Sequence, residues 1–401
     1  MKSTNILKTL FSIAVSTLAS AMIAGAIGLP VATVALVLMP LSVLLGMSNQ
    51  GAYAFEFISG TPITFNGKEA REGIIEPAYM SPEISEFLTI VEDIVAKEQI
   101  AFLGRITKIT QIDAGCGTGA MNKAVPMTDK FWNPVAVKAW LTQCASDLES
   151  TFFVWGLSKG IKKYDLTTGD FIDFAMDIMT TAVKEDALRL IWFGDTGADT
   201  ILNASFLQDA GDIPFYDAID GLWKQVFDAV TATTMNQVAI TANAGGTYAL
   251  QALGATDAYD IFRGMLEQAD ARLKSEPNKM ILCTTSMWEN WLTYKETRNI
   301  DMSFVRQEKG FKTDMYRGVP IYAMDFWDRQ INSDMNDGTA WITPHRALLT
   351  TKENMLVGLD ASGAIQDFKV FLDDVTEINH MKGGYKVDVK IIHEFMTIAA
   401  Y

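Results

Sequence analysis

Apolar residues recur at helical spacing from about residue 84 of this chain. Ser81 offers a capping hydroxyl and Pro82 fits the first position of a helix. From there apolar side chains return every three or four residues, as Ile84 and Phe87 do, and the pattern lasts to about Ile100. This spacing predicts an amphipathic helix that begins after Ser81.

A longer helix is predicted further along the chain. Thr168 or Asp170 can cap it, an apolar face continues to Phe193, and Gly194 is expected to supply a left-handed stop. Its other face is charged, so one side is expected to pack while the other meets water. Shorter helices are predicted over residues 216–230, over residues 257–273, and from a cap at Ser286.

Short strands are predicted between and after these helices. Uninterrupted or alternating apolar runs occur at residues 279–284, 316–324, 339–343, 355–359, 368–372 and 386–399. Residues 102–140 have an extended pattern interrupted by glycines and prolines, which predicts a long two-stranded excursion. Because helices and strands interleave without regular alternation, the predicted class is α+β and not a doubly wound sheet.

The amino-terminal region carries a long uncharged run. No Asp, Glu, Lys, Arg or His occurs from Thr9 to Phe55, and Ala52-Tyr53-Ala54 has the small-x-small pattern of a signal-peptidase site. Pro30 breaks the run into two apolar pieces, each near or below the roughly 20 residues needed to span a bilayer. A secretory signal, a membrane hairpin and a buried arm of an assembly are all open alternatives.

The remainder of the chain is strongly acidic. Because Lys2 and Lys8 account for two of the 33 basic residues, residues 56–401 hold 31 basic and 48 acidic side chains, a net charge of −17. No second uncharged apolar run of spanning length occurs there, so we expect a soluble body of two or three lobes. A negative surface repels phosphates, which disfavours unaided nucleic-acid binding.

One glycine-rich turn has the spacing of a cofactor loop. Residues 113–119 read Asp-Ala-Gly-Cys-Gly-Thr-Gly and look like the glycine loop of S-adenosylmethionine-dependent methyltransferases. That loop needs a following helix and, roughly 20 residues on, an acid for the ribose. Here Pro126 interrupts the helix, and residues 135–138 read Val-Ala-Val-Lys. A loop tip between extended segments is the favoured interpretation, and a methyltransferase is a third hypothesis.

Other catalytic patterns are missing from the sequence. The three cysteines have no metal or disulfide spacing and are expected to be buried; they are Cys116, Cys144 and Cys283. The three histidines are expected to be structural; they are His345, His380 and His393. Glu353 and the pair Asp373-Asp374 form no spaced acid and base. Helical spacing places Met287, Trp288 and Trp291 in a core or contact surface. We therefore assign no catalytic, cofactor-binding or metal-binding residue and predict no enzyme.

Four segments together resemble the major capsid proteins of tailed phages, which have the Hong Kong 97-type fold. "NKMILCTTSMWENWLTYKETR" (278–298) is similar to the strand and helix of the axial lobe, and "YRGVPIYAMD" (316–325) resembles the strand with a Gly-x-Pro pattern. "TAWITPHRALLTTKENMLVGLD" (339–360) resembles the strand, connection and strand that follow. "FKVFLDDVTEINHMKGGYKVDVKIIHEF" (368–395) is similar to the terminal strands of the peripheral lobe.

The resemblance covers roughly residues 60–401 and implies a division of the chain. Residues 1–55 would be an apolar extension, 56–101 an amino-terminal arm and helix, and 102–150 an extended loop. Residues 151–214 would hold the spine helix and part of the peripheral domain. Residues 215–325 would be mainly axial domain, and 326–401 the remaining axial and peripheral strands.

The resemblance also implies partners. Copies of the chain itself would form hexamers and pentamers of an icosahedral head, with portal, scaffolding and maturation proteins as further partners. Packaged DNA would be enclosed without sequence-specific binding, and no cofactor is implied. The chain would assemble in the host cytoplasm and reside in the virion. The alternative is a secreted or membrane-anchored ligand-binding domain with residues 1–54 as signal or anchor, in which residues 9–55 contact a membrane.

Deleting residues 1–55 tests what the uncharged run does. We expect the truncated body to fold, because its own apolar pattern is complete, while correct assembly is impaired. Circular dichroism and negative-stain microscopy of both chains check the two expectations. Normal particles from the truncated chain would count against a role for the run in assembly.

Overall fold

The computed structural model describes residues 63–65, 71–100, 130–160, 168–197, 213–298, 306–308, 310–360, 366–373 and 378–401. Contacts divide the chain into two units of several segments each. Unit 1 contains Met1–Thr64, Trp140–Ile178 and Lys369–Lys382, and unit 2 contains Phe65–Ala139, Met179–Phe368 and Gly383–Tyr401. The uncharged run from Thr9 to Phe55 lies outside the described residues.

Helices and strands are interleaved irregularly along the chain, which confirms the predicted α+β class. The longer helices are α6 (Ala145–Ser158), α7 (Thr168–Phe193), α9 (Leu222–Thr231), α10 (Asp257–Gln268), α12 (Thr285–Thr297) and α13 (Asp325–Asp334). Shorter helical pieces are a π-helix (Arg71–Ile75), α4 (Glu76–Tyr79), α5 (Pro82–Ser85), α8 (Ile213–Tyr216), α11 (Ala271–Ser275), and 3-10 turns at Thr241–Ala244, Lys352–Asn354 and Glu394–Met396. None of the described helices is both long and apolar enough to cross a membrane.

Unit 2 contains a mixed seven-stranded sheet in the order β4-β13-β9-β5-β8-β7-β6. Its strands are β4 (Asn236–Val238), β5 (Lys279–Cys283), β6 (Arg306–Glu308), β7 (Phe311–Tyr316), β8 (Val319–Ala323), β9 (Ala347–Thr351) and β13 (Ile398–Ala400). β5 runs parallel to β8 and antiparallel to β9, with Ile281 opposite both Ile321 and Leu349. Every residue of β9 is buried, as expected for a strand in the middle of a sheet.

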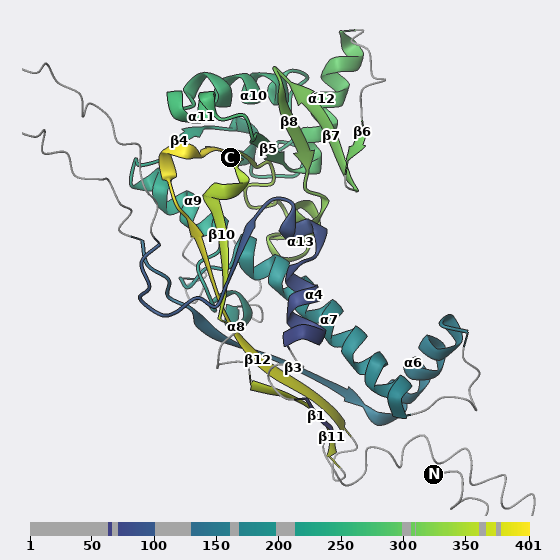
Figure 1. Ribbon diagram of the computed structural model, residues 1–401. Helices are drawn as coiled ribbons and strands as arrows, with labels where there is room; N and C mark the ends of the chain where they lie inside the picture. The colour runs from purple at the N-terminus through teal and green to yellow at the C-terminus, as the bar shows by residue number, and fades with distance from the viewer. Residues whose placement is uncertain are drawn as a thin grey trace, which may run out of the picture. The chain divides into compact units, whose positions relative to one another are not determined.

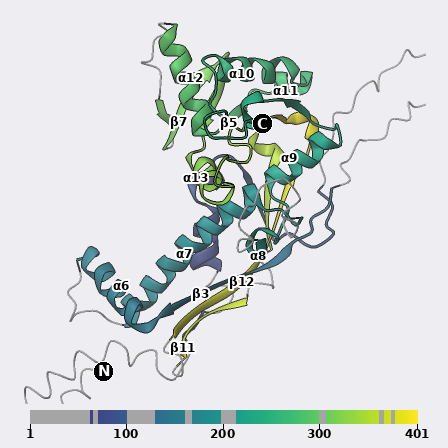
Figure 2. The ribbon, with the colours of Figure 1, turned by 180° about the vertical axis from the view of Figure 1, so that it is seen from behind.

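The main core of unit 2 lies between this sheet and two helices. Figures 1 and 2 both show α10 and α12 beside β5 and β7. The predicted core role of the α12 side chains is confirmed, because Met287, Trp288 and Trp291 are at most 5% exposed. They pack with Phe262 and Met265 of α10 and with strand residues that include Ile281, Ile321 and Leu349.

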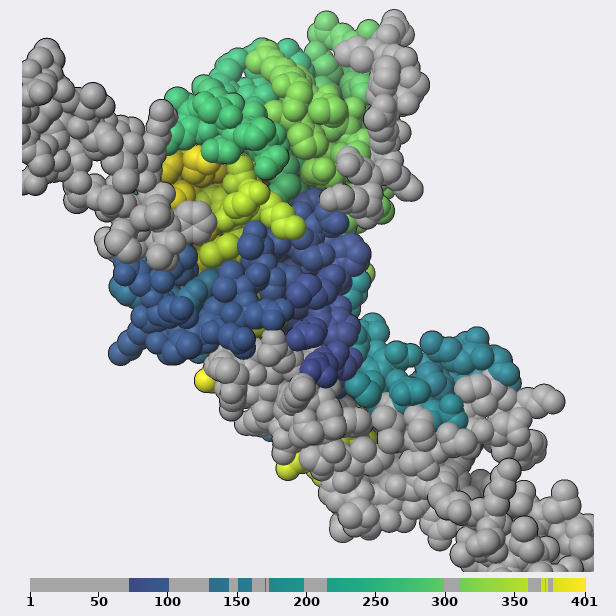
Figure 3. Space-filling model, viewed as in Figure 1, coloured from purple at the N-terminus to yellow at the C-terminus, as the bar shows by residue number. Residues whose placement is uncertain are grey.

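A second sheet follows the order β1-β11-β12-β10-β2, with β3 paired to β12. Its strands are β1 (Ile63–Phe65), β2 (Thr89–Glu92), β3 (Val135–Cys144), β10 (Met355–Asp360), β11 (Gln366–Asp373) and β12 (Ile378–Ile391). Within unit 2, β10 pairs antiparallel with β12 and parallel with β2. Figure 3 shows the purple and blue residues 71–100 beside yellow-green residues near the carboxyl end of the chain.

The helix predicted from Ser81 to about Ile100 is wrong beyond its first turn. α5 ends at Ser85, and β2 then follows as a strand beside β10. Two residues in this segment, Asp93 and Lys97, have φ of 58° and 64°, which no continuous α-helix allows. Four of the six apolar side chains at helical spacing are nevertheless buried, namely Ile84, Phe87, Leu88 and Ile94, whereas Val95 is 58% exposed. Burial could therefore be predicted where the backbone conformation could not.

The strand predicted at residues 339–343 is also wrong, because side chains occupy its backbone groups. The Asp337 carboxylate accepts from Ala340 N at 2.6 Å, and the Gln251 side chain bonds both Trp341 N and Trp341 O, at 3.0 and 2.6 Å. Asn336 and Trp341 make only an isolated bridge. The strand lies instead at β9, inside the segment predicted as a connection.

Other element boundaries shift for local reasons. The helix predicted over 257–273 is two helices, because the Asp270 carboxylate accepts from Arg272 N and caps α11. The helix predicted over 216–230 becomes α8 and α9. The cap of α12 is Thr284 and not Ser286. The strand predicted over 386–399 ends at Ile391, and β13 follows a 3-10 turn. Helices α6 and α13 and strand β7 were not predicted.

A charged side chain lies inside unit 2. Arg346, just before β9, is fully buried, and its guanidinium lies 5.2–5.7 Å from the ring centroids of Phe193, Trp223 and Phe227. It donates to the carbonyls of Thr343 at 2.8 Å and Ile342 at 3.1 Å. Burial lowers the pKa of Arg346 to about 9, against an opposing effect of Asp328. This guanidinium joins the end of α7, α9 and the entry to β9.

The long helix predicted to end at Phe193 is confirmed as α7, but its stop is different. Gly194 does not have the left-handed φ that the prediction required. A Cβ at Gly194 would instead lie 2.4 Å from the Ile219 carbonyl oxygen and 2.8 Å from that of Leu190. Gly221 N donates to the Gly194 carbonyl at 2.8 Å. Close backbone approach, and not turn geometry, is the reason for glycine here.

Gly194→Ala should therefore destabilise the protein by about 1–3 kcal/mol, as overpacking does in well-packed regions. Gly246→Ala is the matched control, because a Cβ at Gly246 meets nothing within 4 Å and its φ is not left-handed. Urea unfolding followed by tryptophan fluorescence measures both midpoints. Equal urea midpoints for the two variants would show that the structure accommodates a Cβ atom at Gly194.

Candidate functional site

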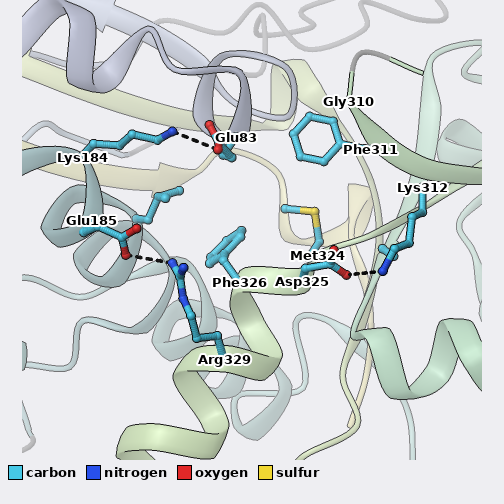
Figure 4. Close-up of a pocket in the computed structure, with 12 residues that line it drawn as sticks. Glu83, Lys184, Glu185, Gly310, Phe311, Lys312, Met324, Asp325, Phe326 and Arg329 are labelled. Atoms are coloured by element: carbon cyan, nitrogen blue, oxygen red, sulfur yellow. Dashed lines mark hydrogen bonds and ion pairs between the residues drawn. The ribbon is translucent and has the colours of Figure 1, made fainter. Parts of the chain in front are cut away.

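A charged pocket of about 380 Å³ lies in unit 2, where α5, α7, β7 and α13 meet (Figure 4). The pocket has a floor of apolar side chains and a rim of charged ones. Its lining residues are Glu83, Lys184, Glu185, Leu188, Gly310, Phe311, Lys312, Ala323, Met324, Asp325, Phe326 and Arg329. Residues from distant parts of the sequence are thus brought to one hollow.

Each cation of the rim is paired with a carboxylate. Lys184 lies 2.9 Å from Glu83, Arg329 lies 2.8 Å from Glu185, and Lys312 lies 3.2 Å from Asp325. Figure 4 shows the three pairs on separate sides of the hollow. All six side chains are partly exposed, so each pair contributes only about 0–1 kcal/mol.

The pair between Glu83 and Lys184 is ionised at neutral pH. Burial of Glu83 tends to raise the pKa of its carboxyl, but hydrogen bonds from Lys184 and from the backbone outweigh this and lower the pKa. The lining residues include no histidine, cysteine or serine. Because its charges are matched internally, this pocket serves to connect four elements of the unit.

The contact between α7 and α13 continues beyond the pocket. Arg189 Nε donates to Gln330 Oε1 at 2.8 Å, and Gln330 Nε2 donates to Tyr216 Oη at 2.7 Å. Further along, the rings of Trp192 and Trp327 meet edge to face, with centroids 4.8 Å apart. Polar bonds at the rim and aromatic packing in the interior together hold α13 on α7.

Among the described residues, His345 is the histidine that lies beside a hydroxyl resembling a nucleophile. His345 Nδ1 is 2.7 Å from Ser286 Oγ, and His345 Nε2 is 2.6 Å from the Gln251 carbonyl. Because a carbonyl can only accept, Nε2 carries the proton and Nδ1 accepts from Ser286. The sequence placed no histidine beside a nucleophile, since residues 286 and 345 are far apart. The imidazole, 7% exposed, links the start of α12 to the segment before β9.

The other residues singled out from the sequence are dispersed. Nδ1 of His380 accepts from Trp140 Nε1 at 3.2 Å, and the His393 ring stacks on Phe395 with centroids 5.1 Å apart. Cys283 is buried as predicted, with Sγ 3.6 Å from the Tyr322 carbonyl oxygen, and burial raises the pKa of its thiol. Among the described residues, no group of histidines, cysteines and carboxylates could hold a metal ion.

Several earlier predictions fall partly or wholly outside the described residues. The glycine turn at 113–119, Cys116 and Asp374 lie outside the described residues, so the methyltransferase hypothesis stays a prediction. Cys144 ends β3, where only the backbone is described. Glu353 is exposed in a 3-10 turn of unit 2, and Asp373 ends β11 in unit 1.

Unit 1 presents large apolar side chains to solvent. On β3, Trp140 is 55% exposed, and on α6, Val154 and Leu157 are 66% and 64% exposed. The opposite side of α6 packs within the unit, since the Phe152 ring lies 5.3 Å from that of Phe174 on α7. The i,i+3 spacing of Val154 and Leu157 places both on one side of the helix. This surface was missed because α6 itself was not predicted.

His345 should make stability depend on pH. Burial lowers its pKa from the ordinary value of 6.5, with the Gln251 carbonyl and Asp257 opposing this in part. As the pH falls through 6.5, the imidazole is therefore protonated in the unfolded state before it is protonated in the folded state. The free energy of unfolding is highest above pH 6.5 and decreases below it, by up to about 1.4 kcal/mol per pH unit. Urea unfolding of wild type, His345→Gln and the half-buried control His380→Gln at pH 7.5 and 5.5 measures this. Only His345→Gln should flatten the dependence; an unchanged slope would contradict the assignment.

Comparison with known proteins finds likeness in structure only. No protein-family model and no curated protein matches the chain. A chain of the "Satellite phage P4 procapsid including size determination (Sid) protein" is 10% identical, with 83% of this chain and 96% of that chain covered and a TM-score of 0.47.

Two further solved structures are similar to the chain. One is the "Cyanophage A-1(L) capsid asymmetric unit", 12% identical over 79% of this chain and 91% of that chain, with a TM-score of 0.44. The other is the holo-SrpI encapsulin complex from Synechococcus elongatus, 11% identical over 80% and 87%, with a TM-score of 0.41. Two of these three titles name phage procapsid or capsid structures, and the third names an encapsulin complex.

Proposed function

We propose that this chain is the major capsid protein of a tailed phage, many copies of which assemble into a closed shell. The observation that carries this proposal is the set of exposed apolar side chains on unit 1, Trp140, Val154 and Leu157. Val154 and Leu157 project from α6, whose other side already packs within the unit. Such a surface fits a protein that buries it against neighbouring subunits.

The apolar character of this surface favours a protein partner. Single exposed apolar residues are ordinary on a soluble protein. Here two of them share one turn of α6, while the aromatic side of that helix, with Phe152 and Trp155, is directed to Phe174. A helix that is apolar on both sides has one side left for a second contact. Identical contacts of this heterologous kind close into rings and shells when their rotations permit it.

The finer arrangement follows the same proposal. Copies of the chain form hexamers and pentamers of an icosahedral head, with residues 215–325 mainly in the axial domain and 102–150 as the extended loop. Portal, scaffolding and maturation proteins are further partners, and assembly takes place in the host cytoplasm. The protein acts as a structural component and carries out no catalysis.

The acidic composition fits a container for nucleic acid. The net charge of −15 repels the phosphates of packaged DNA, so a shell of this chain encloses DNA without binding it tightly. DNA is then enclosed without sequence-specific binding. The alternative, a secreted or anchored ligand-binding domain, depends on the uncharged run alone and predicts a monomer in a membrane or periplasmic fraction.

Val154→Asp with Leu157→Asp should abolish assembly without unfolding the chain, because both side chains are exposed in the single subunit. Size-exclusion chromatography with light scattering and negative-stain microscopy should show shells, hexamers or pentamers for the wild type only. Circular dichroism should be unchanged in the variant.

The matched control adds the same two charges at exposed polar positions of unit 2, Gln268→Glu with Ser275→Asp. The control should assemble as the wild type does. A wild-type chain that remains monomeric, or a double aspartate variant that assembles normally, would count against the proposed function of this surface.

A further inference from the structure

Three arginines from different elements of unit 2 converge on one cluster of tyrosines. Arg263 of α10 lies over the Tyr259 ring at 5.7 Å, Arg298 after α12 over Tyr294 at 5.6 Å, and Arg317 in the β7–β8 turn over Tyr316 at 5.3 Å. We call this set the arginine–tyrosine platform: Arg263, Arg298, Arg317, Tyr259, Tyr294 and Tyr316. All three arginines are exposed.

The tyrosine rings form one continuous group. Tyr259 and Tyr294 are stacked, with centroids 4.6 Å apart and planes inclined by 13°. Tyr316 meets Tyr259 edge to face at 5.8 Å, and Trp291 beneath them meets Tyr316 at 5.4 Å. The three cation–aromatic contacts therefore belong to a single surface feature and not to three separate ones.

A buried polar group holds this surface in place. Asp314 Oδ2 accepts from Trp291 Nε1 at 2.7 Å and from Lys295 Nζ at 2.8 Å. The side chains of Asp314 and Lys295 are only 5% and 7% exposed. Because α12 is thereby fixed to β7, the rings are ordered before any partner arrives. Binding to a preorganised surface loses less conformational entropy than binding to a mobile one.

The hairpin turn that carries Arg317 is not built from the residues that such turns favour. Arg317 and Gly318 both have positive φ, 51° and 78°, as the two central residues of a type I′ turn require. Asn, Asp or Gly accept this conformation with less strain than arginine does. Turn geometry alone therefore does not explain an arginine at this tip, whereas a role for its guanidinium does.

The composition of the platform indicates its partner. Tyrosine, tryptophan and arginine are the residues that dominate binding energy in protein interfaces. The chain as a whole is acidic, with 48 acidic against 33 basic residues, so a second copy offers mostly carboxylates to a cluster of guanidinium groups. The same excess of negative charge opposes binding of a nucleic acid at this surface.

We propose that the arginine–tyrosine platform binds a carboxylate-bearing surface of a second copy of this chain. This inference rests on the proposed shell-forming function and assigns one of its subunit contacts. Of the three platform arginines, only Arg263 forms ion pairs with described residues of its own chain. It lies 3.5 Å from Asp260 and 3.6 Å from Glu267, and all three side chains are partly exposed. Exchange of such exposed pairs for pairs with a neighbour costs little.

The test uses the full chain with Arg263→Ala, Arg298→Ala and Arg317→Ala combined. The protein concentration needed for half-assembly, measured by light scattering, should rise about ten-fold or more, as loss of interface arginines predicts. The control Arg272→Ala, Lys274→Ala and Lys279→Ala removes the same charge elsewhere in unit 2 and should assemble as the wild type does. If circular dichroism shows that the triple variant is unfolded, Arg317→Glu alone, at the exposed turn, should give the same loss.

The possible outcomes distinguish the platform contact from the proposed shell-forming function. Wild type and platform variant assembling equally would overturn the platform contact and leave the shell function intact, while a wild-type chain that never assembles would overturn both. Equal loss in the control would show an effect of net charge and overturn the contact. Binding of a fluorescent thymidine oligonucleotide by the wild type but not by the variant, with assembly unchanged, would assign the platform to nucleic acid instead.

Discussion

The buried guanidinium of Arg346 is the constraint on which the packing of unit 2 depends. A charge removed from water costs several kcal/mol unless its surroundings replace the lost hydration. Here the faces of Phe193, Trp223 and Phe227 and the carbonyls of Thr343 and Ile342 replace part of it, and burial still lowers the pKa of Arg346 to about 9. These groups come from the end of α7, from α9 and from the segment before β9. Satisfying one guanidinium therefore positions three elements at once.

The same region explains why α7 ends where it does. Phe193, the last residue of α7, contributes a ring to the Arg346 site, and Gly194 then lets the backbone approach Ile219 closely. The chain can return as α9 only because neither Gly194 nor Gly221 has a side chain in that contact. Trp223 and Phe227 of α9 thereby reach the guanidinium. Backbone approach and cation–aromatic contact are two parts of one arrangement.

Buried polar groups also connect the core to the surfaces proposed for assembly. Asp314 holds Trp291 and Lys295, and on this base the tyrosines and arginines of the platform are arranged. In unit 1, the aromatic side of α6 packs on α7 so that Val154 and Leu157 are presented outward. An acidic chain with preordered arginines and exposed apolar side chains has the properties of a subunit that binds its own copies. No catalytic arrangement is needed for that role.

Periodicity in the sequence determined the α+β class, the span of α7, strands β5 and β8, and the burial of Met287, Trp288 and Trp291. These follow from local spacing, because the periodicity of the apolar residues matched that of the element that formed. The absence of catalytic spacing also follows from the residues alone. At the candidate sites, however, the sequence predicted neither the pocket nor the platform.

Tertiary structure alone decided the rest. Residues 81–100 have helical spacing, yet part of this segment forms β2 because β10 offers an open edge for pairing. Residues 339–343 have the composition of a strand, yet the side chains of Asp337 and Gln251 bind their backbone. The contacts of Arg346 with Phe193 and Trp223, and of Tyr316 with Tyr259, join residues far apart in sequence. Local pattern records which side chains avoid water, but only the folded chain determines which distant groups satisfy one another.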